Sequence, residues 1–405
     1  MANSRRRFLS QSAAITAATA SLGFPAIVRG QSGPVKIGIL HPVTGPLAYS
    51  GGLSRLGAQI AVDEINRAGG IKSLGGARIE AVLGDARSQP QIGVSEVEKM
   101  NEAGVSAIVG AYASAICLAT TQAAAKYNIP HVVDVGVADQ IVERGLKNTF
   151  RFAPGYRKVT EDAIKNLDAM NTQAKRPAKT VVIVHEESLF GTGTANLLGK
   201  ELPPLGYEIK DVIKHANPTR DFSNIVLRLK AINADIVIPA NYYDEYVLLV
   251  RTMKQQGVVP KAVYSVLGGG ASSFKFVKES PDIAAGIMDC NHWYNAKNPA
   301  ARALRSKVEA MKDQFFTYEV FLNYQCVYLL VDAIENARSR DRDAITAALE
   351  KSTWDKHFMP YGPTRFVNGQ NQGAQPMMLQ VQQGDIKVVL PKNFAESDPV
   401  FPWKA

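Results

Sequence analysis

Hydroxyl, phenol and amide side chains gather in short segments that follow apolar, β-branched runs. Ser114 comes shortly after the run 107–109, and Tyr242 and Tyr243 come shortly after the run 236–239. Such groups donate and accept hydrogen bonds, and tyrosine rings add an apolar stacking surface. This chemistry suits the capture of a small polar molecule.

Motifs for catalysis and for metal binding are missing. The histidines do not lie within metal-ligand spacing of one another, and the close pair Cys290 and His292 has no further ligand beside it. The sequence contains no GxSxG elbow and no GxxxxGK[ST] loop, and the segments 191–193 and 268–270 do not complete GxGxxG. We therefore expect no enzyme activity, no cofactor and no metal site.

Strand and helix patterns alternate in two successive sets. The first set predicts strands at 35–40, 79–83, 107–109 and 131–133, with helices at 51–68, 94–103 and 114–127. The second predicts strands at 180–185, 207–213, 236–239 and 263–265, with helices at 159–170, 194–205, 222–232 and 243–256. Strands separated by helices of this length form parallel βαβ units, so the chain is expected to be α/β with two doubly wound parallel-sheet lobes. Later segments predict helices at 300–316, 321–337 and 343–349, and strands at 377–381 and 386–390.

The strand ends locate a candidate site. In open parallel sheets ligands bind outside the carboxyl ends of the strands, so the loops that follow the predicted strands are expected to line it. The candidate ligand-binding residues are Tyr49, Ser50, Tyr112, Ala113, Ser114, Asp134, Val135, Gly136, Phe190, Tyr242, Tyr243 and Leu267.

Three of these candidates have alternative interpretations. Ser114 opens a predicted helix, where free N–H groups attract a carboxylate, but serine is also a common N-cap. At least one of Tyr242 and Tyr243 is expected to pack into the core of its lobe. Asp134 has three readings: it holds a cation or an amide, it caps a helix, or it braces a hinge.

Composition excludes some classes of protein. The chain has 405 residues, 46% hydrophobic and 20% charged, which suits a globular protein of about two domains. Four arginines in residues 1–30, a segment without acids, contribute to the formal charge of +9, so the remaining chain carries +5. Its basic residues are interleaved with acids, which argues against nucleic-acid binding. Three cysteines without a CxxC motif provide no disulfide framework.

The first 30 residues read as an export signal. Residues 4–10 are Ser-Arg-Arg-Arg-Phe-Leu-Ser, which fits the twin-arginine pattern, and a mildly apolar run follows at 13–26. We expect cleavage near residue 30 and a periplasmic location. No cysteine is present in the segment for a lipid anchor, and no later run is apolar enough to span a membrane.

The sequence resembles the leucine/isoleucine/valine-binding type of periplasmic receptors, which bind branched-chain amino acids, amides and related acids. The resemblance runs from about Val35 to the C-terminal strands. The segments that carry it are VKIGIL at 35–40, TGPLA at 44–48, AVDEINRAGGI at 61–71, IVGAYAS at 108–114, Ile129-Pro130, Phe150-Arg151, Phe190-Gly191 and Asp221-Phe222-Ser223.

The resemblance implies a type I periplasmic binding protein fold, with two lobes joined by a three-strand hinge. Lobe 1 is expected to comprise 33–153 plus 287–362, and lobe 2 to comprise 154–286 plus 363–405. The lobes would close over a small-molecule ligand and dock on an inner-membrane ABC permease with cytoplasmic ATPases. We expect a monomer.

Some ligand-binding positions of the family match residues of this chain, and others do not. The resemblance gives Ser114 the role of holding the ligand carboxylate, places Tyr49 and Ser50 on a cleft loop, and assigns aromatic positions to Phe190 and to Tyr242 or Tyr243. Two groups that hold an α-amino acid are absent: Val137 and Ala138 stand where a threonine is usual, and Val266-Leu267-Gly268 stands where an acid binds the ammonium. The cysteine pair of some members is replaced by Arg87 and Ala113. The expected ligand is an acid or amide without a standard ammonium group, aromatic ligands included, unless Asp134 supplies the missing counter-charge.

Two other functions remain open. A soluble ligand sensor that regulates gene expression uses the same fold but stays in the cytosol, which the export signal disfavours. A nucleotide-dependent enzyme would require tight nucleotide binding, for which the motifs are missing.

Overall fold

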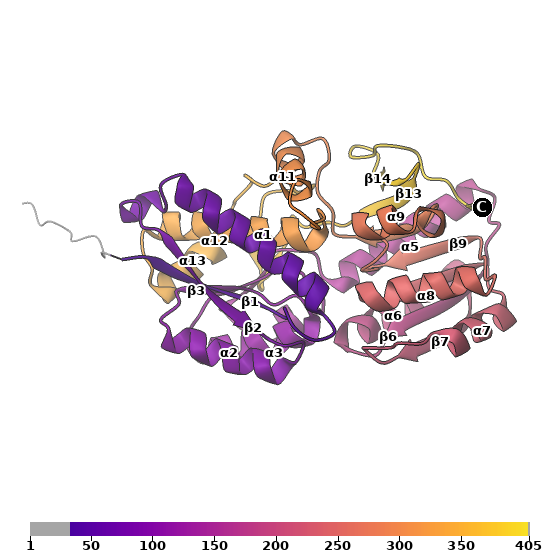
Figure 1. Cartoon of the computed structure of the whole chain (residues 1–405), viewed down its shortest axis with the longest axis horizontal. Helices are drawn as coiled ribbons and strands as arrows, with labels where there is room; N and C mark the ends of the chain where they lie inside the picture. Colours follow the sequence, from indigo (N-terminus) through magenta and orange to yellow (C-terminus); the bar gives the residue numbers. More distant parts are fainter. Residues whose placement is uncertain (1–32, 404–405) are drawn as a thin grey trace, which may run out of the picture. The chain divides into compact units, whose positions relative to one another are not determined.

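The computed structural model describes residues 33–403, and its strands form two seven-stranded sheets (Figure 1). In spatial order, the first sheet contains β11 (Phe366–Val367), β12 (Gln370–Asn371), β5 (Thr149–Arg151), β4 (His131–Val133), β3 (Ala107–Gly110), β1 (Val35–His41) and β2 (Ile79–Asp85). The second contains β14 (Asp385–Leu390), β13 (Met377–Gln382), β10 (Met288–Asn291), β9 (Ala262–Val266), β8 (Ile236–Ala240), β6 (Thr180–Glu186) and β7 (Glu208–His215). We define lobe 1 as the first sheet with its helices, and lobe 2 as the second sheet with its helices.

Both sheets are mostly parallel, as the alternating pattern predicts. The antiparallel pairs among the described strands are β11 with β12, β10 with β13 and β13 with β14. The central strands β3, β4 and β8 are buried along their whole length, because helices cover both faces of each sheet. This arrangement confirms the predicted α/β fold with two doubly wound lobes.

The helices of lobe 1 are α1 (Ala48–Arg67), α2 (Pro90–Glu102), α3 (Ser114–Ala125), α4 (Gln140–Glu143), α12 (Tyr318–Ala337) and α13 (Arg342–Glu350), with the 3₁₀ turn η1 (Lys72–Leu74). Those of lobe 2 are α5 (Tyr156–Gln173), α6 (Leu189–Glu201), α7 (Ser223–Ile232), α8 (Tyr243–Gln255), α9 (Phe274–Glu279) and α10 (Pro281–Ala284), with the 3₁₀ turn η2 (Pro203–Leu205). Helix α11 (Pro299–Glu309) contacts both lobes, since Lys307 pairs with Glu64 of α1 and Arg305 lies 3.9 Å from Asp385 of β14.

Lobe 1 is completed by helices from the late part of the chain. Helix α12 lies beside α1, as the orange and indigo ribbons of Figure 1 show. The two backbones approach closely at Gly57, where a Cβ atom would lie 2.0 Å from the carbonyl oxygen of Val320. Any larger residue at this position would push the two helices apart.

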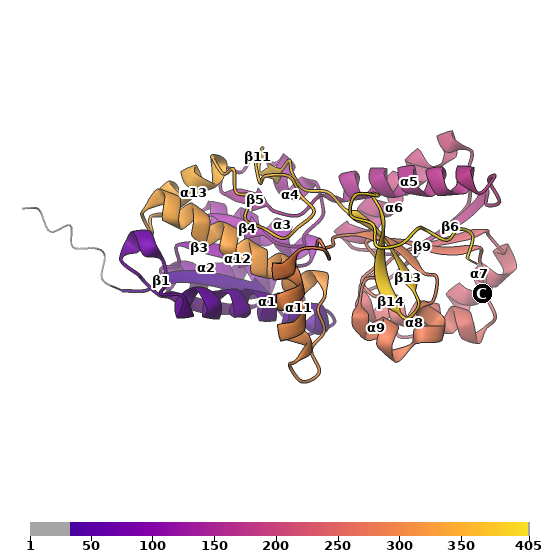
Figure 2. The ribbon, with the colours of Figure 1, turned by 90° about the horizontal axis from the view of Figure 1, so that it is seen from above.

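The chain passes between the two sheets three times, after β5, after β10 and between β12 and β13. In Figure 2 the yellow strands β13 and β14 lie with the elements of lobe 2. The sheets differ from the expected lobe boundaries at two places: β10 falls in the range 287–362 but belongs to the second sheet, and β11 and β12 fall in 363–405 but belong to the first. Strand pairing, which a chain segment shows only once folded, decides this membership.

Candidate functional site

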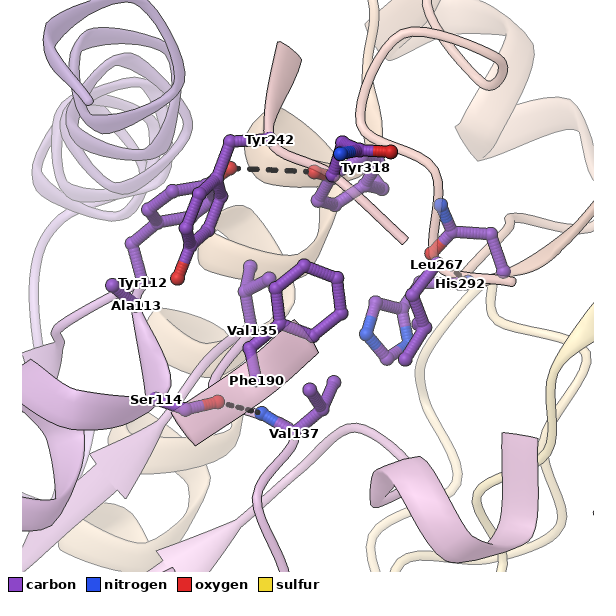
Figure 3. A pocket seen from close by; sticks show the side chains of 12 residues that line it. Tyr112, Ala113, Ser114, Val135, Val137, Phe190, Tyr242, Leu267, His292 and Tyr318 are labelled. Atoms are coloured by element: carbon purple, nitrogen blue, oxygen red, sulfur yellow. Dashed lines mark hydrogen bonds between the residues drawn. The ribbon is translucent and has the colours of Figure 1, made fainter. Parts of the chain in front are cut away.

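A pocket lies where the carboxyl ends of strands from both lobes face each other. Its walls come from the loops after β3 and β4, the loops after β8, β9 and β10, and the N-termini of α3, α6 and α12. Figure 3 shows the side chains around it. The lining residues are Tyr112, Ala113, Ser114, Val135, Val137, Phe190, Asn241, Tyr242, Leu267, Asn291, His292 and Tyr318.

The predicted site residues divide into two groups. Those that line the pocket are Tyr112, Ala113, Ser114, Val135, Phe190, Tyr242 and Leu267. Those that lie outside its lining are Tyr49, Ser50, Asp134, Gly136 and Tyr243. The first group comes from both lobes, whereas the residues of the second group have other surroundings.

Ser114 connects two loops of lobe 1. Its hydroxyl oxygen accepts hydrogen bonds from the backbone N–H groups of Val137 and Ala138, both at 3.2 Å, and the first of these is drawn in Figure 3. The hydroxyl does not cap α3, whose N-cap is Ala113 without a side-chain hydrogen bond. The hydroxyl hydrogen is thus left to donate into the pocket, beside the first N–H groups of α3.

Arg151 supports the same loop from behind. Its guanidinium is buried and donates to the carbonyl oxygens of Val137 at 2.8 Å and Ala138 at 2.7 Å, and it pairs with Asp139 at 3.1 Å. The peptide groups that bond Ser114 are therefore held on both sides. A loop fixed in this way presents preorganised groups to a ligand.

Two lining residues adopt the left-handed backbone conformation. Tyr112 follows β3 with φ of 64°, and Leu267 follows β9 with φ of 57°. Residues with a side chain avoid this region unless their surroundings impose it, and such positions concentrate at ligand sites. In each lobe a buried aspartate holds the turn: Asp134 accepts from the N–H of Tyr112 at 3.0 Å, and Asp289 accepts from the N–H of Gly268 at 3.0 Å.

Asp134 lies behind the pocket within a hydrogen-bond network. Its side chain is fully buried and also accepts from His41 Nε2 at 3.1 Å and from Asn323 Nδ2 at 2.9 Å. Burial raises the pKa of its carboxyl, but the hydrogen bonds and the interaction with His41 outweigh burial, so the pKa is lowered. With these partners the carboxylate braces the turn at Tyr112.

Asp289 is buried without a cationic partner among its hydrogen-bonding neighbours. Besides Gly268 it accepts from Asn291 Nδ2 at 2.9 Å. Burial raises the pKa of Asp289 to about 7, because the hydrogen bonds only partly offset desolvation.

The remaining predicted residues join or support the lobes. The rings of Tyr49 on α1 and Tyr243 on α8 lie 4.4 Å apart between centroids, and Lys275 Nζ of α9 lies 4.9 Å from the Tyr49 ring. Ser50 is buried near Tyr112, and Gly136 packs against Cys117. Of the two adjacent tyrosines, Tyr242 faces the pocket and Tyr243 lies at the contact between lobes.

Five lining residues are not among the predicted site residues: Val137, Asn241, Asn291, His292 and Tyr318. Asn241 lies two residues after the predicted strand 236–239, so its position at a strand end was visible in the sequence. Asn291 is the last residue of β10 and His292 follows it, and the pattern did not reveal this short strand because it carries polar residues. Tyr318 opens α12, and no local signal connects it with the pocket.

His292 is the least satisfied polar group in the pocket. It is buried, and neither ring nitrogen has a hydrogen-bond partner within the described part of the chain. Burial, aided by the charge of Arg151, lowers the pKa of His292 to about 3, so the ring is neutral at ordinary pH. A neutral imidazole offers one donor and one acceptor to a ligand.

The pocket as a whole is aromatic and uncharged. Four rings, those of Tyr112, Phe190, Tyr242 and Tyr318, surround it, and among residues 33–403 no aspartate, glutamate, lysine or arginine lines it. Over the same residues no cluster of three or more histidine, cysteine or acidic side chains is suited to a metal ion. The chemistry of the pocket is therefore stacking and neutral hydrogen bonding.

Two α/β lobes with a pocket at facing strand ends define the architecture of a type I periplasmic binding protein. The comparisons agree. The family described as "Periplasmic binding protein" matches residues 34–385. The Leu/Ile/Val-binding protein homolog 8 of Brucella abortus is 30% identical over 375 residues, which cover 89% of this chain and 91% of that protein.

Solved structures show the same fold. The branched-chain amino acid transporter substrate-binding protein LivJ of Streptococcus pneumoniae, in complex with isoleucine, has a TM-score of 0.74 at 22% identity and covers 87% of this chain and 97% of its own. An ABC transporter solute-binding protein of R. palustris, in complex with benzoate, has a TM-score of 0.76 at 18% identity. The match covers 92% of this chain and 100% of that chain.

The chain belongs to the periplasmic binding protein family, and within it to the Leu/Ile/Val-binding type. Members of this family are solute-binding proteins and not enzymes. Within residues 33–403 no helix has both the length and the apolar character needed to cross a membrane. The predicted export signal at 1–30 lies outside the described residues.

Proposed function

We propose that the chain is the periplasmic substrate-binding component of an ABC importer, and that it captures a small acid or amide with an apolar or aromatic body. The observation that supports this proposal is the pocket at the facing strand ends, which is walled by four rings and to which residues 33–403 contribute no charged side chain. An α-amino acid brings an ammonium group, and placing it there without an acid would cost several kcal/mol. A carboxylate or amide has donors available at Ser114 and His292.

Binding would couple to closure of the lobes. Three connections join the two sheets, and lobe 1 meets lobe 2 at ring contacts such as Tyr112 with Tyr242, 5.9 Å between centroids. A ligand between these rings contacts both lobes at once and so favours the closed state. The closed form would be the one that docks on the inner-membrane permease, and no catalysis is needed.

A thermal-shift screen of the exported chain tests the proposal. The library contains branched-chain amino acids, their amides, short aliphatic acids and aromatic carboxylates. A true ligand at one hundred times its Kd stabilises the folded state by about 2.7 kcal/mol. We expect acids and amides without an ammonium group to give the largest shifts.

Matched variants show whether the pocket is responsible. Val137→Trp fills the pocket and is expected to abolish the shift, whereas Val367→Trp changes an exposed valine on β11 and is expected to leave it intact. Loss of the shift in both variants, or in neither, would contradict binding at this pocket.

A further inference from the structure

Asn241 presents a free hydrogen-bond acceptor to the pocket from lobe 2. It follows β8, is fully buried and lines the pocket. Its amide nitrogen Nδ2 donates to His215 Nε2, and its carbonyl oxygen Oδ1 has no partner within residues 33–403. An unpaired buried carbonyl costs stability unless something satisfies it, which points to a ligand group.

His215 fixes which end of this amide faces the pocket. The Nδ1–H group of His215 donates to the carbonyl oxygen of Ala216 at 2.8 Å, which leaves Nε2 of the neutral ring as an acceptor. Only the amide nitrogen of Asn241 can then face His215. The ring of Phe222, 4.8 Å away between centroids, holds the imidazole in place.

The charge state of His215 agrees with this assignment. Burial lowers its pKa, and the nearby His185 lowers it further, while the carbonyl of Ala216 and the charge of Glu187 act in the opposite direction. The net direction is downward from the ordinary value of 6.5, so the ring is neutral at pH 7.5.

The other asparagine of the pocket makes a useful contrast. Asn291 uses both ends of its amide: Nδ2 donates to Ser272 and to Asp289, and Oδ1 accepts from the N–H of His292 at 2.7 Å. It therefore has no acceptor to offer that is not already engaged. Of the two amides, Asn241 is the one aimed at a ligand.

We infer that Asn241, positioned by His215, selects ligands that carry a neutral hydrogen-bond donor, a hydroxyl or an amide N–H, at the end that faces lobe 2. The inference rests on the proposed function and narrows its ligand class. A charged ammonium is disfavoured because, in the described part of the chain, no carboxylate lines the pocket to balance it. The expected ligand has a carboxylate or amide toward Ser114, an apolar or aromatic body, and a hydroxyl or amide N–H toward Asn241.

Titration calorimetry with 4-hydroxybenzoate and benzoate tests the inference. These acids differ only in one hydroxyl, and a site that accepts from this group binds 4-hydroxybenzoate at least about tenfold more tightly, since benzoate leaves the oxygen of Asn241 unpaired. Binding of both acids with equal affinity contradicts the inference and leaves the proposed function standing. Binding of neither acid, nor of any amide or short acid in the screen, contradicts both.

Substitutions separate the two residues. Asn241→Leu and Asn241→Ser remove the amide oxygen, and each is expected to reduce the preference for 4-hydroxybenzoate to less than about threefold. His215→Phe keeps Asn241 but removes its partner, so the amide is free to turn and the preference is expected to fall. His215→Gln restores an acceptor and should recover it. A preference that survives both Asn241 variants, or that fails to recover in His215→Gln while the variant keeps its fold by circular dichroism, overturns the assignment.

Discussion

The turn after β3 in lobe 1 and the turn after β9 in lobe 2 share a backbone design but differ in their electrostatic surroundings. Each places a non-glycine residue in the left-handed region at the pocket, Tyr112 in one and Leu267 in the other. Each is held by a buried aspartate that accepts a backbone N–H at 3.0 Å. The pKa of Asp134 is lowered, whereas that of Asp289 is raised to about 7.

The difference comes from the second layer of neighbours. Asp134 receives hydrogen bonds from His41 and Asn323 in addition to the backbone, and these outweigh burial. Asp289 interacts with the side chains of Asn291 and Ser272, but neither neighbour carries a charge and their hydrogen bonds do not outweigh burial. The turn requires only an oxygen acceptor at this place, and the neighbours of that oxygen decide whether it carries a charge.

The same substitution in the two aspartates should give the largest contrast. Asp134→Asn replaces an acceptor with an amide nitrogen that faces the donors of His41 and Asn323, and the loss of two bonds to a charged group is expected to cost about 3 kcal/mol. Asp289→Asn resembles the protonated form that burial already favours, so the expected cost at pH 6 is below about 1 kcal/mol.

Urea unfolding followed by far-ultraviolet circular dichroism measures both free energies of unfolding. The slope with urea serves as the control, because an unchanged slope means that the difference reflects stability and not a changed unfolded state. An equal loss of free energy of unfolding in the two variants would show that the neighbours do not give the two carboxyls different charge states.

The pH dependence of stability should differ in sign between the two aspartates. The raised pKa of Asp289 means that, between about pH 4 and pH 7, the folded chain holds a proton that the unfolded chain has lost. Its contribution to the free energy of unfolding therefore falls as pH rises through this window, by at most about 1.4 kcal/mol per pH unit. The lowered pKa of Asp134 has the opposite effect, because its stabilising contribution is present above pH 3.8 and is lost as pH falls further.

Urea titrations of the wild type and of Asp289→Asn between pH 4 and pH 8 check this sign. The stability of the wild type relative to the variant should decline up to about pH 7 and then level off. A flat or rising difference would mean that Asp289 is ionised throughout and that its raised pKa is wrong.

Much of this comparison could be predicted from the sequence, since the alternation of strands and helices implies where the carboxyl ends lie. The structure brings Tyr112, Ser114, Phe190, Tyr242 and Leu267 together at the pocket, and their role in ligand binding stays a prediction. Each of them follows a predicted strand within a few residues, so the order of strands and helices was enough to group them. The same runs predicted two lobes, which the sheets confirm.

The residues that were missed depend on pairing between distant segments. Strand β10 has the sequence Met-Asp-Cys-Asn, which has no strand pattern of its own, and it forms by pairing with β9 and β13. Asn291 and His292 were therefore not predicted to lie at a strand end. Asp134 has two side-chain partners, His41 and Asn323, which are 282 positions apart in the chain. No local pattern shows that an aspartate will be surrounded in this way.

The smallest effect concerns Tyr49 and Tyr243, where the two lobes touch outside the pocket lining. The sequence placed both tyrosines at the ligand, and their ring contact suggests instead that they stabilise the closed arrangement, with Lys275 over both rings. Tyr49→Ala should reduce the binding free energy of every ligand by the same amount, about 0.5–1.5 kcal/mol, which is the contribution of an aromatic pair. It should also increase the radius of gyration of the liganded chain in small-angle scattering. Tyr49→Phe keeps the ring and should change neither quantity. If Tyr49→Ala instead alters the order in which ligands are preferred, Tyr49 contacts the ligand directly, as the sequence predicts. The interface between the lobes would then contribute to selectivity, as the turns at Tyr112 and Leu267 do.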